Sequence, residues 1–245
     1  MTQGIYTILS NRRLAKDTWE MVLGGDSSAL TRPGQFINIA LEGLYLRRPI
    51  SVCCYEEGSI TIIYKVVGKG TGQMAAMTEG GKLDVLVGLG NGFDVEKARG
   101  RKVAVIGGGV GVPPMYDTAR RLKKMGADVT AILGFATKDV SFYIEKFEEL
   151  GIPVMVTTDD GSLGTKGFVT DALKASGCEY FMACGPTPML RALHRTGIPG
   201  QLSFEERMGC GFGACMGCSI MTKEGAKRVC KDGPIFQKEV LEWQI

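Results

Sequence analysis

The stretch C-G-F-G-A-C-M-G-C, from Cys210 to Cys218, organises this chain, and a fourth cysteine follows at Cys230. The spacing C-x4-C-x2-C with a distant last cysteine is the plant-type [2Fe–2S] ligand pattern. Glycines lie among the cysteines, which suits a loop whose backbone amides must approach bridging sulfides. The pattern therefore predicts a [2Fe–2S] cluster with four ligands: Cys210, Cys215, Cys218 and Cys230.

Zinc binding and unliganded thiols stay open as other uses of these cysteines at this point. A zinc site with four cysteines usually pairs two C-x2-C knuckles, whereas Cys210 and Cys230 lie outside any such pair. A disulfide framework is disfavoured because a chain of 245 residues can bury a core without covalent cross-links. The other cysteines are expected to be packing residues or inert thiols: Cys53, Cys54 and Cys178.

The composition is that of an ordinary globular chain, with 44% apolar and 22% charged residues. A net charge of +3 is too small, and the charges too evenly spread, to indicate nucleic-acid binding. No apolar run is long enough to span a membrane, and the N-terminus lacks the basic and apolar regions of a secretory signal. We expect a cytoplasmic protein without a nucleic-acid or membrane partner. In that reducing compartment clustered cysteines favour metal binding.

The first 98 residues predict a small antiparallel β-domain. Short runs rich in Ile, Val and Tyr alternate with turn signals such as Pro33-Gly34, Glu57-Gly58 and Gly80-Gly81. Such regular spacing indicates a barrel or a sandwich. The expected strands cover residues 5–9, 18–23, 35–40, 50–55, 59–67 and 82–87, and one short helix is expected over 71–77.

Two motifs of this domain are suited to holding a diphosphate. Arg48, in the run Arg47-Arg48-Pro49-Ile50-Ser51, can pair bidentately with a phosphate. The loop Gly68–Gly72 offers backbone amides and a helix N-terminus. A basic turn and a glycine-rich connection would explain the same residues. Tyr64 is suited to stacking on an aromatic ring, or to half-buried packing in its strand.

Residues 99 to 204 alternate strand and helix patterns, which predicts a parallel sheet with right-handed crossovers. Ligands of such sheets bind outside the carboxyl ends of the strands. The expected strands cover 103–106, 128–133, 153–157, 180–184 and 201–204. The first expected helix follows Val112-Pro113-Pro114 and ends at about residue 124. The other expected helices cover 139–150, 167–176 and 186–194.

The first strand of this sheet runs into Gly107-Gly108-Gly109-Val110-Gly111, which is similar to a dinucleotide-binding loop. The match is partial, because Val112 stands at the third glycine position. No acidic residue follows the second strand to hold a ribose hydroxyl.

Cys184-Gly185-Pro186 ends the fourth strand, so the thiol faces the same crevice or packs in the core. Asp159 lies at this ligand edge or in a simple turn.

Taken in order, these motifs resemble the ferredoxin reductase-like flavoproteins along the whole chain. Within that superfamily they are most similar to the electron-transfer subunits of class B dihydroorotate dehydrogenases. The motifs that carry the resemblance are Arg48–Ser51, Gly68–Gly72, Gly107–Pro114, Cys184–Pro186, Glu206–Cys218 and Cys230–Pro234. Gly209 is a mild departure, since alanine is expected there.

The resemblance implies three units: an FAD-binding β-barrel domain (1–98), an NAD-binding α/β domain (99–204) and a [2Fe–2S] subdomain (205–245). The FAD contacts that it implies are Arg48, Pro49, Ile50, Ser51, Ile63, Tyr64, Lys65, Gly70 and Thr71. The NAD site that it implies is lined by Gly107, Gly108, Gly109, Gly111 and Gly185. Cys184 would lie near the nicotinamide as the candidate catalytic residue.

A relay follows from these three redox groups. A nicotinamide takes two electrons as a hydride, a [2Fe–2S] cluster carries one, and a flavin handles both. Nothing else in the chain is suited to oxidising an organic substrate, so electrons must enter through a partner. The resemblance implies an FMN-containing dihydroorotate dehydrogenase catalytic subunit, two of each chain in a heterotetramer, and electron flow to NAD⁺ in pyrimidine synthesis.

Other functions remain compatible with the sequence. One is the small flavin and iron–sulfur subunit of an NADH-linked ferredoxin:NADP or sulfide oxidoreductase. A second is a nucleotide-binding redox sensor with a four-cysteine zinc module, and a third is a reductase that serves a separate oxygenase. The preference for NAD over NADP is also left open.

Overall fold

Six antiparallel strands of the N-terminal part close into a barrel in the order β1-β2-β5-β4-β3-β6. The structure, a computed structural model, describes residues 1–243. The barrel elements are β1 (Thr2–Ala15), β2 (Thr18–Gly24), β3 (Phe36–Ile39), β4 (Arg48–Glu56), β5 (Ser59–Lys65), helix α1 (Lys69–Ala75) and β6 (Lys82–Leu89). Alternate apolar side chains fill the interior, among them Ile8, Met21 and Ile37, because successive residues of a strand face opposite sides.

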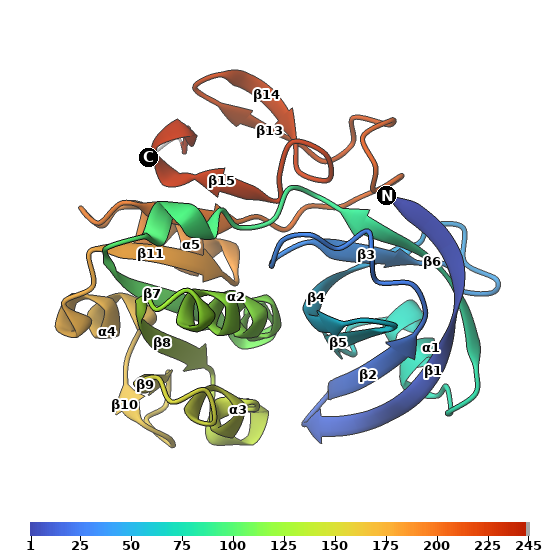
Figure 1. Cartoon of the computed structure of the whole chain (residues 1–245), viewed down its shortest axis with the longest axis horizontal. Helices are drawn as coiled ribbons and strands as arrows, with labels where there is room; N and C mark the ends of the chain where they lie inside the picture. Colours follow the sequence, from blue (N-terminus) through green and yellow to red (C-terminus); the bar gives the residue numbers. More distant parts are fainter. Residues whose placement is uncertain (244–245) are drawn as a thin grey trace.

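A second domain lies beside the barrel and is built on a seven-stranded sheet (Figure 1). The strand order is β10-β9-β8-β7-β11-β12-β15, and all neighbours are parallel except the pair β12 and β15. The strands are β7 (Lys102–Gly108), β8 (Asp128–Phe135), β9 (Val154–Thr158), β10 (Thr165–Lys166), β11 (Tyr180–Cys184), β12 (Gly200–Ser203) and β15 (Ile235–Gln237). The helices are α2 (Val112–Lys124), α3 (Ile144–Glu148), α4 (Val169–Ser176) and α5 (Thr187–His194).

Four short 3-10 helices complete this domain and its ends: η1 (Val95–Ala98), η2 (Gly109–Gly111), η3 (Lys138–Val140) and η4 (Lys238–Val240). Most boundaries lie within a few residues of those expected from the sequence. The helix expected over 139–150 is wrong as one element, because it is divided into η3 and α3. Tyr143, between them, has a left-handed φ of 68°, which an α-helix does not accommodate.

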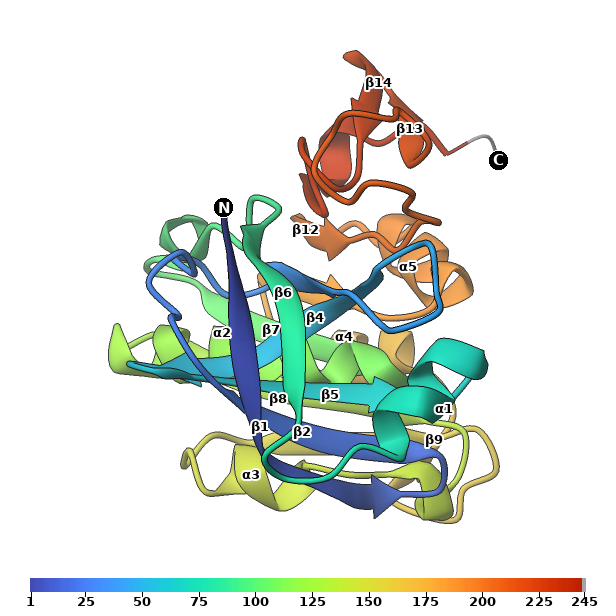
Figure 2. The ribbon, with the colours of Figure 1, turned by 90° about the vertical axis from the view of Figure 1, so that its right-hand side faces the viewer.

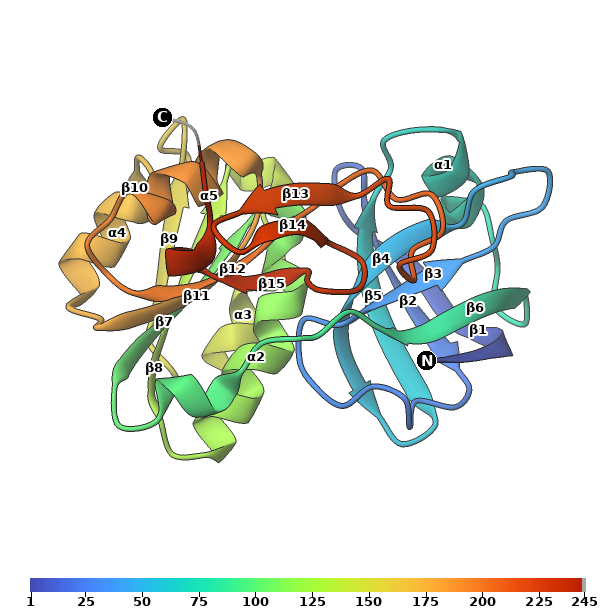
Figure 3. The same ribbon diagram turned by 90° about the horizontal axis from the view of Figure 1, so that it is seen from above.

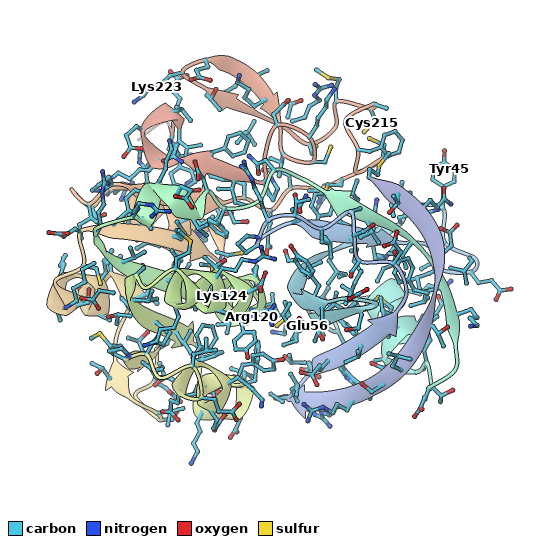
Figure 4. All side chains as sticks on the ribbon, viewed as in Figure 1. Tyr45, Glu56, Arg120, Lys124, Cys215 and Lys223 are labelled. Carbon is cyan, nitrogen blue, oxygen red and sulfur yellow. The ribbon has the colours of Figure 1, made fainter. Side chains whose placement is uncertain are left out.

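Helix α2 joins the two domains, since it covers the sheet and also packs against β4 of the barrel. Arg120 pairs with Glu56 and donates to the carbonyl oxygen of Tyr55 at 3.1 Å. Figure 4 shows Arg120 and Glu56 meeting between the domains. Arg121 lies over the Tyr55 ring at 4.9 Å. These contacts fix the orientation of the sheet domain relative to the barrel.

The C-terminal segment stands on the edge of the sheet and the top of the barrel (Figure 2). It contains the hairpin of β13 (Ser219–Thr222) and β14 (Gly225–Arg228), close to the expected one. Strand β15 was not expected from the sequence. Phe236 on β15 joins Cys218 and Cys230 in the core cluster that also includes residues of the sheet and barrel, and Trp243 packs against His194 and Phe204.

Within residues 1–243, no helix is both long and apolar enough to cross a membrane.

Candidate functional site

The four predicted cluster ligands form two pairs. The backbone N–H of Cys210 donates to Sγ of Cys215 at 3.4 Å, and the backbone N–H of Cys215 donates to Sγ of Cys210 at 3.4 Å. In the second pair the N–H of Cys230 donates to Sγ of Cys218 at 3.4 Å. Two irons bridged by sulfide take two protein ligands each, so paired thiols fit this group.

A single metal ion fits this arrangement less well. Tetrahedral zinc needs all four ligands around one centre. Across the described residues, no three His, Cys, Asp or Glu side chains are gathered closely enough to hold one metal ion. The two pairs and the C-x4-C-x2-C spacing fit two irons with two cysteine ligands each.

The backbone conformation of the loop before Cys218 explains why this loop contains glycines. Gly211 and Gly213 have φ of +79° and +96°, a region that L side chains rarely adopt. A Cβ on Gly209 would lie 3.2 Å from Sγ of Cys215, so the small residue leaves that sulfur space. Burial opposes ionisation of Cys210, but N–H groups of Cys215 and Phe212 lower its pKa to about 6. The thiolate is the form that ligates metals.

The two predicted diphosphate-binding motifs meet in the barrel. Arg48 begins β4, and Gly70 lies in the first turn of α1. A Cβ on Gly70 would overlap Nε of Arg48, so the two stretches touch only because this residue is glycine. Thr71 is committed to the turn, because its Oγ1 accepts the N–H of Val67 at 2.9 Å. The barrel thus has a guanidinium beside a glycine-rich helix start, an arrangement that fits an anionic diphosphate.

The other predicted FAD contacts divide by exposure. Pro49, Ile50 and Ser51 are half-buried on β4, and Lys65 is exposed at the end of β5. Ile63 and Tyr64 are 3% and 1% exposed. Tyr64 lies in the barrel core, and its hydroxyl donates to Oδ1 of Asn11 at 3.0 Å. Its ring packs in the barrel core, and its contact with FAD stays a prediction.

A cavity of about 670 Å³ lies at the carboxyl ends of the parallel strands, between the two domains. Of the predicted NAD residues, Gly108, Gly109 and Gly185 line this cavity. Gly107 and Gly111 lie behind it and allow close packing. A Cβ on Gly107 would come 2.6 Å from Cα of Val112, and one on Gly111 would meet the backbone of Cys184. The loop Gly107–Gly111 therefore packs closely against the start of α2.

Cys184 is buried at the end of β11, 1% exposed, and is not among the residues that line the cavity. Burial, reinforced by the charge of Glu205, raises the pKa of its thiol to about 12. The thiol is therefore protonated at neutral pH. Gly185, directly after it, lines the cavity, and the assignment of Cys184 as a catalytic residue stays a prediction.

The cavity is also lined by residues that no sequence motif marks as functional. From the barrel come Lys16 and Thr18, and from the sheet domain come Phe168, Val169, Met189 and Glu205. The rule that ligands bind at strand carboxyl ends would have found Glu205, which follows β12. No sequence signal marks Lys16 and Thr18, because only domain packing brings their turn to the sheet. Asp159, at the end of β9, does line the cavity.

A closed antiparallel barrel beside a parallel nucleotide-binding sheet, with a four-cysteine segment, defines a ferredoxin reductase-like flavoprotein that carries an iron–sulfur module. Residues 105–195 match the oxidoreductase NAD-binding domain. Residues 205–242 match the iron–sulfur cluster binding domain of dihydroorotate dehydrogenase B.

Relatives then identify the family. The chain is 45% identical to the dihydroorotate dehydrogenase B (NAD(+)), electron transfer subunit of Bacillus caldolyticus, over 94% of this chain and 95% of that one. It is 43% identical to the subunit of the same name from Shouchella clausii (strain KSM-K16), over 96% of each. The chain belongs to the family of dihydroorotate dehydrogenase B electron transfer subunits. It is an oxidoreductase subunit whose redox groups are FAD, a [2Fe–2S] cluster and NAD(H).

Solved structures agree on the fold. A chain from a study of the NADH-dependent reduced ferredoxin-NADP oxidoreductase superposes with a TM-score of 0.87 at 31% identity, over 98% of this chain and 90% of that one. The ferredoxin reductase of carbazole 1,9a-dioxygenase superposes with a TM-score of 0.69 at 23% identity, over 81% and 67%. The higher identity to the dihydroorotate dehydrogenase B subunits favours that family over the ferredoxin:NADP type.

Proposed function

We propose that this chain passes electrons from a catalytic partner to NAD⁺ through three sites that meet at the junction of its domains. One observation carries this proposal: Glu205 lines the cavity between the domains and also begins the cysteine segment. The units would be the FAD barrel (1–98), the NAD domain (99–204) and the [2Fe–2S] subdomain (205–245), of which the last two residues lie outside the described part.

Each unit would hold one redox group with its own residues. Cys210, Cys215, Cys218 and Cys230 would ligate the cluster. Arg48 would pair with the FAD diphosphate, and Gly70 would leave room for that pairing. Gly108, Gly109 and Gly185 would line the dinucleotide site, where the N-terminus of α2 favours a pyrophosphate. When bound, these groups supply the conversion between one-electron and two-electron transfer.

The partner that we propose is an FMN-containing dihydroorotate dehydrogenase catalytic subunit, in a heterotetramer with two copies of each chain. Figure 4 shows Cys215 on the loop at the outer edge of the molecule. Phe212 and Met216 beside it are 45% and 56% exposed. An exposed apolar loop at the ligands supports docking there, since electrons must leave the partner close to the cluster. The complex would work in the cytoplasm, without nucleic acid or membrane.

The test uses Cys215→Ser in the purified complex. Loss of one thiolate removes the cluster without touching the FAD or NAD residues. NADH should still reduce FAD at the wild-type rate in stopped-flow absorbance, while electrons no longer pass between FAD and the partner. Cys178→Ser, at a buried cysteine outside the segment, is the control and should transfer electrons normally. Unchanged transfer in Cys215→Ser would overturn the proposed order of the relay.

A further inference from the structure

The cluster loop is attached to the barrel by one buried side chain. Asn38 lies on β3 and is 1% exposed. Its Nδ2 donates to the carbonyl oxygen of Cys210 at 3.2 Å. Figure 3 shows the segment before β13 reaching across to the barrel near β3 and β4. The contact thus joins the first cluster ligand to a residue 172 positions earlier in the chain.

The same side chain is one strand away from the predicted FAD site. Asn38 is paired with Pro49 in the β3–β4 ladder, and Ile39 is paired with Arg48. The guanidinium of Arg47 also donates to the backbone carbonyl oxygen of Asn38, at 3.4 Å, and it pairs with Asp84. Asn38 therefore lies between the strand that carries the FAD motif and the loop that carries the cluster ligands.

The loop that follows Cys210 leaves space for the side-chain amide of Asn38. Gly211, directly after Cys210, has a φ of +79°, and a Cβ there would overlap Nδ2 of Asn38. A side chain at this position would therefore separate the loop from the barrel. The close approach depends on glycine on one side and on a short amide on the other.

The amide is also an unusual choice for this position. Within the described part of the chain, Oδ1 of Asn38 is buried and has no hydrogen-bond partner. Burying such an acceptor costs free energy, and leucine would fill a similar volume without that cost. The orientation of the amide is set by the Cys210 carbonyl, which needs a donor. The N–H that faces Cys210 is thus the feature that this asparagine contributes.

Holding the Cys210 carbonyl also affects the sulfur of that residue. Sγ of Cys210 accepts the N–H of Ala214 at 3.2 Å and that of Cys215 at 3.4 Å. Hydrogen bonds to ligand sulfurs help to set the potential of an iron–sulfur cluster. Both bonds need the loop to keep its fold around Cys210.

We propose that Asn38 is a positioning residue, which fixes the first cluster ligand and its N–H···S bonds against the FAD-binding barrel. The inference rests on the proposed assignment of the cluster to the four cysteines. Asn38 does not ligate the cluster. It acts through the Cys210 carbonyl, and so it couples the geometry of the cluster site to that of the FAD site.

The experiment compares Asn38→Leu with the wild type in the purified complex. The reduced cluster should show shifted or broadened EPR signals and a shifted midpoint potential. Bleaching of its visible absorbance by an iron chelator should be about tenfold faster, the lower range for losing a residue that orients a metal ligand. Asn11→Leu is the matched control, because the Asn11 amide also donates to barrel carbonyls, those of Met74 and Met77, away from the cluster.

A second pair of variants approaches the contact from the loop, in case Asn38→Leu does not fold. Gly211→Ala introduces the overlap with Asn38 and should reproduce the EPR and bleaching changes. Gly213→Ala carries the same positive-φ strain, but its Cβ would meet Cδ and Cβ of Lys231, at 2.6 and 2.9 Å, and not Asn38. It should change both signals less than Gly211→Ala does.

Wild-type EPR and bleaching in Asn38→Leu and Gly211→Ala would overturn the inference, as would equal changes in Asn11→Leu or Gly213→Ala. A wild-type protein without the [2Fe–2S] spectrum would instead overturn the cluster assignment itself.

Discussion

At the scale of single residues, the contact between Gly70 and Arg48 gives a direct test of the FAD site. A Cβ at Gly70 would displace the Arg48 side chain. Losing one charge-assisted bond to a phosphate costs about 1.5–3 kcal/mol. Gly70→Ala should therefore weaken FAD binding to the apoprotein by about tenfold or more, measured by titrating flavin fluorescence.

The matched control lies in the same helix. A Cβ on Gly72 would have its nearest neighbour, Cγ1 of Val66, 4.0 Å away. Both substitutions change helix propensity equally, but only the first meets Arg48. Equal FAD affinities for Gly70→Ala and Gly72→Ala would show that Arg48 does not hold the cofactor.

Cys184 gives a second prediction at this scale, from its pKa of about 12. The native thiol should resist alkylation by iodoacetamide up to about pH 10, whereas a free thiol with a pKa of about 8.5 reacts readily. Mass spectrometry of the Cys184 peptide provides the measurement, with urea-unfolded protein as the positive control. Rapid native labelling at pH 8 would contradict the burial seen here.

The raised pKa of Cys184 also makes the stability of the fold depend on pH. Because the folded pKa lies above that of the unfolded thiol, Cys184 favours the folded state fully below about pH 8.5. This contribution falls as the pH rises toward the folded pKa of about 12. Cys184→Ala should therefore flatten the alkaline loss of stability of the native chain.

At the scale of elements, helix α2 holds the domain junction through a buried carboxylate. Asp117 is 1% exposed and pairs with Arg120 and Arg121, each at 2.8 Å. Removing one partner of a buried ion pair costs about 3–5 kcal/mol. The arginines are about one third exposed, so we expect Asp117→Asn to destabilise the fold by roughly 2–3 kcal/mol.

Urea unfolding followed by circular dichroism measures this loss. Asp128→Asn, at an exposed aspartate that begins β8, removes the same charge without a buried pair and should change stability little. If both variants unfold at the same urea concentration, the Asp117 pairs do not stabilise the junction.

Sequence patterns predicted elements well where one period dominates. The barrel strands and the alternating strands and helices of the sheet domain fall in this group. The helix over 139–150 failed because Tyr143 turns its ring toward Tyr116, at 5.4 Å, and its hydroxyl toward the barrel. Strand β15 was missed because its three residues form a strand only beside β12.

At the scale of the whole molecule, Tyr143 links the domains a second time. Its hydroxyl donates to Glu20 of β2 at 2.9 Å, and Glu20 is 6% exposed. A hydrogen bond to a charged group contributes about 1.5–3 kcal/mol. Tyr143→Phe should lower the melting temperature by roughly 3–10 °C for a chain of this size, measured by calorimetry.

Tyr116→Phe is the corresponding control. Its ring packs against Tyr143, but among the described residues its hydroxyl has no hydrogen-bond partner. Its melting temperature should stay close to that of the wild type. An unchanged melting temperature in Tyr143→Phe would mean that the bond to Glu20 does not support the domain contact.

The sequence by itself determined the fold class, with a β-barrel, a parallel sheet and a four-cysteine segment in that order, and it predicted the cluster ligands and the two phosphate-binding motifs. These features are local, because spacing, turn chemistry and strand period are set by neighbouring residues. Tertiary structure alone decided that Gly70 touches Arg48, that Lys16 and Thr18 enter the cavity and that Asn38 holds Cys210. Those contacts join residues far apart in the chain, and their geometry exists only once the barrel, the sheet and the cysteine segment pack together.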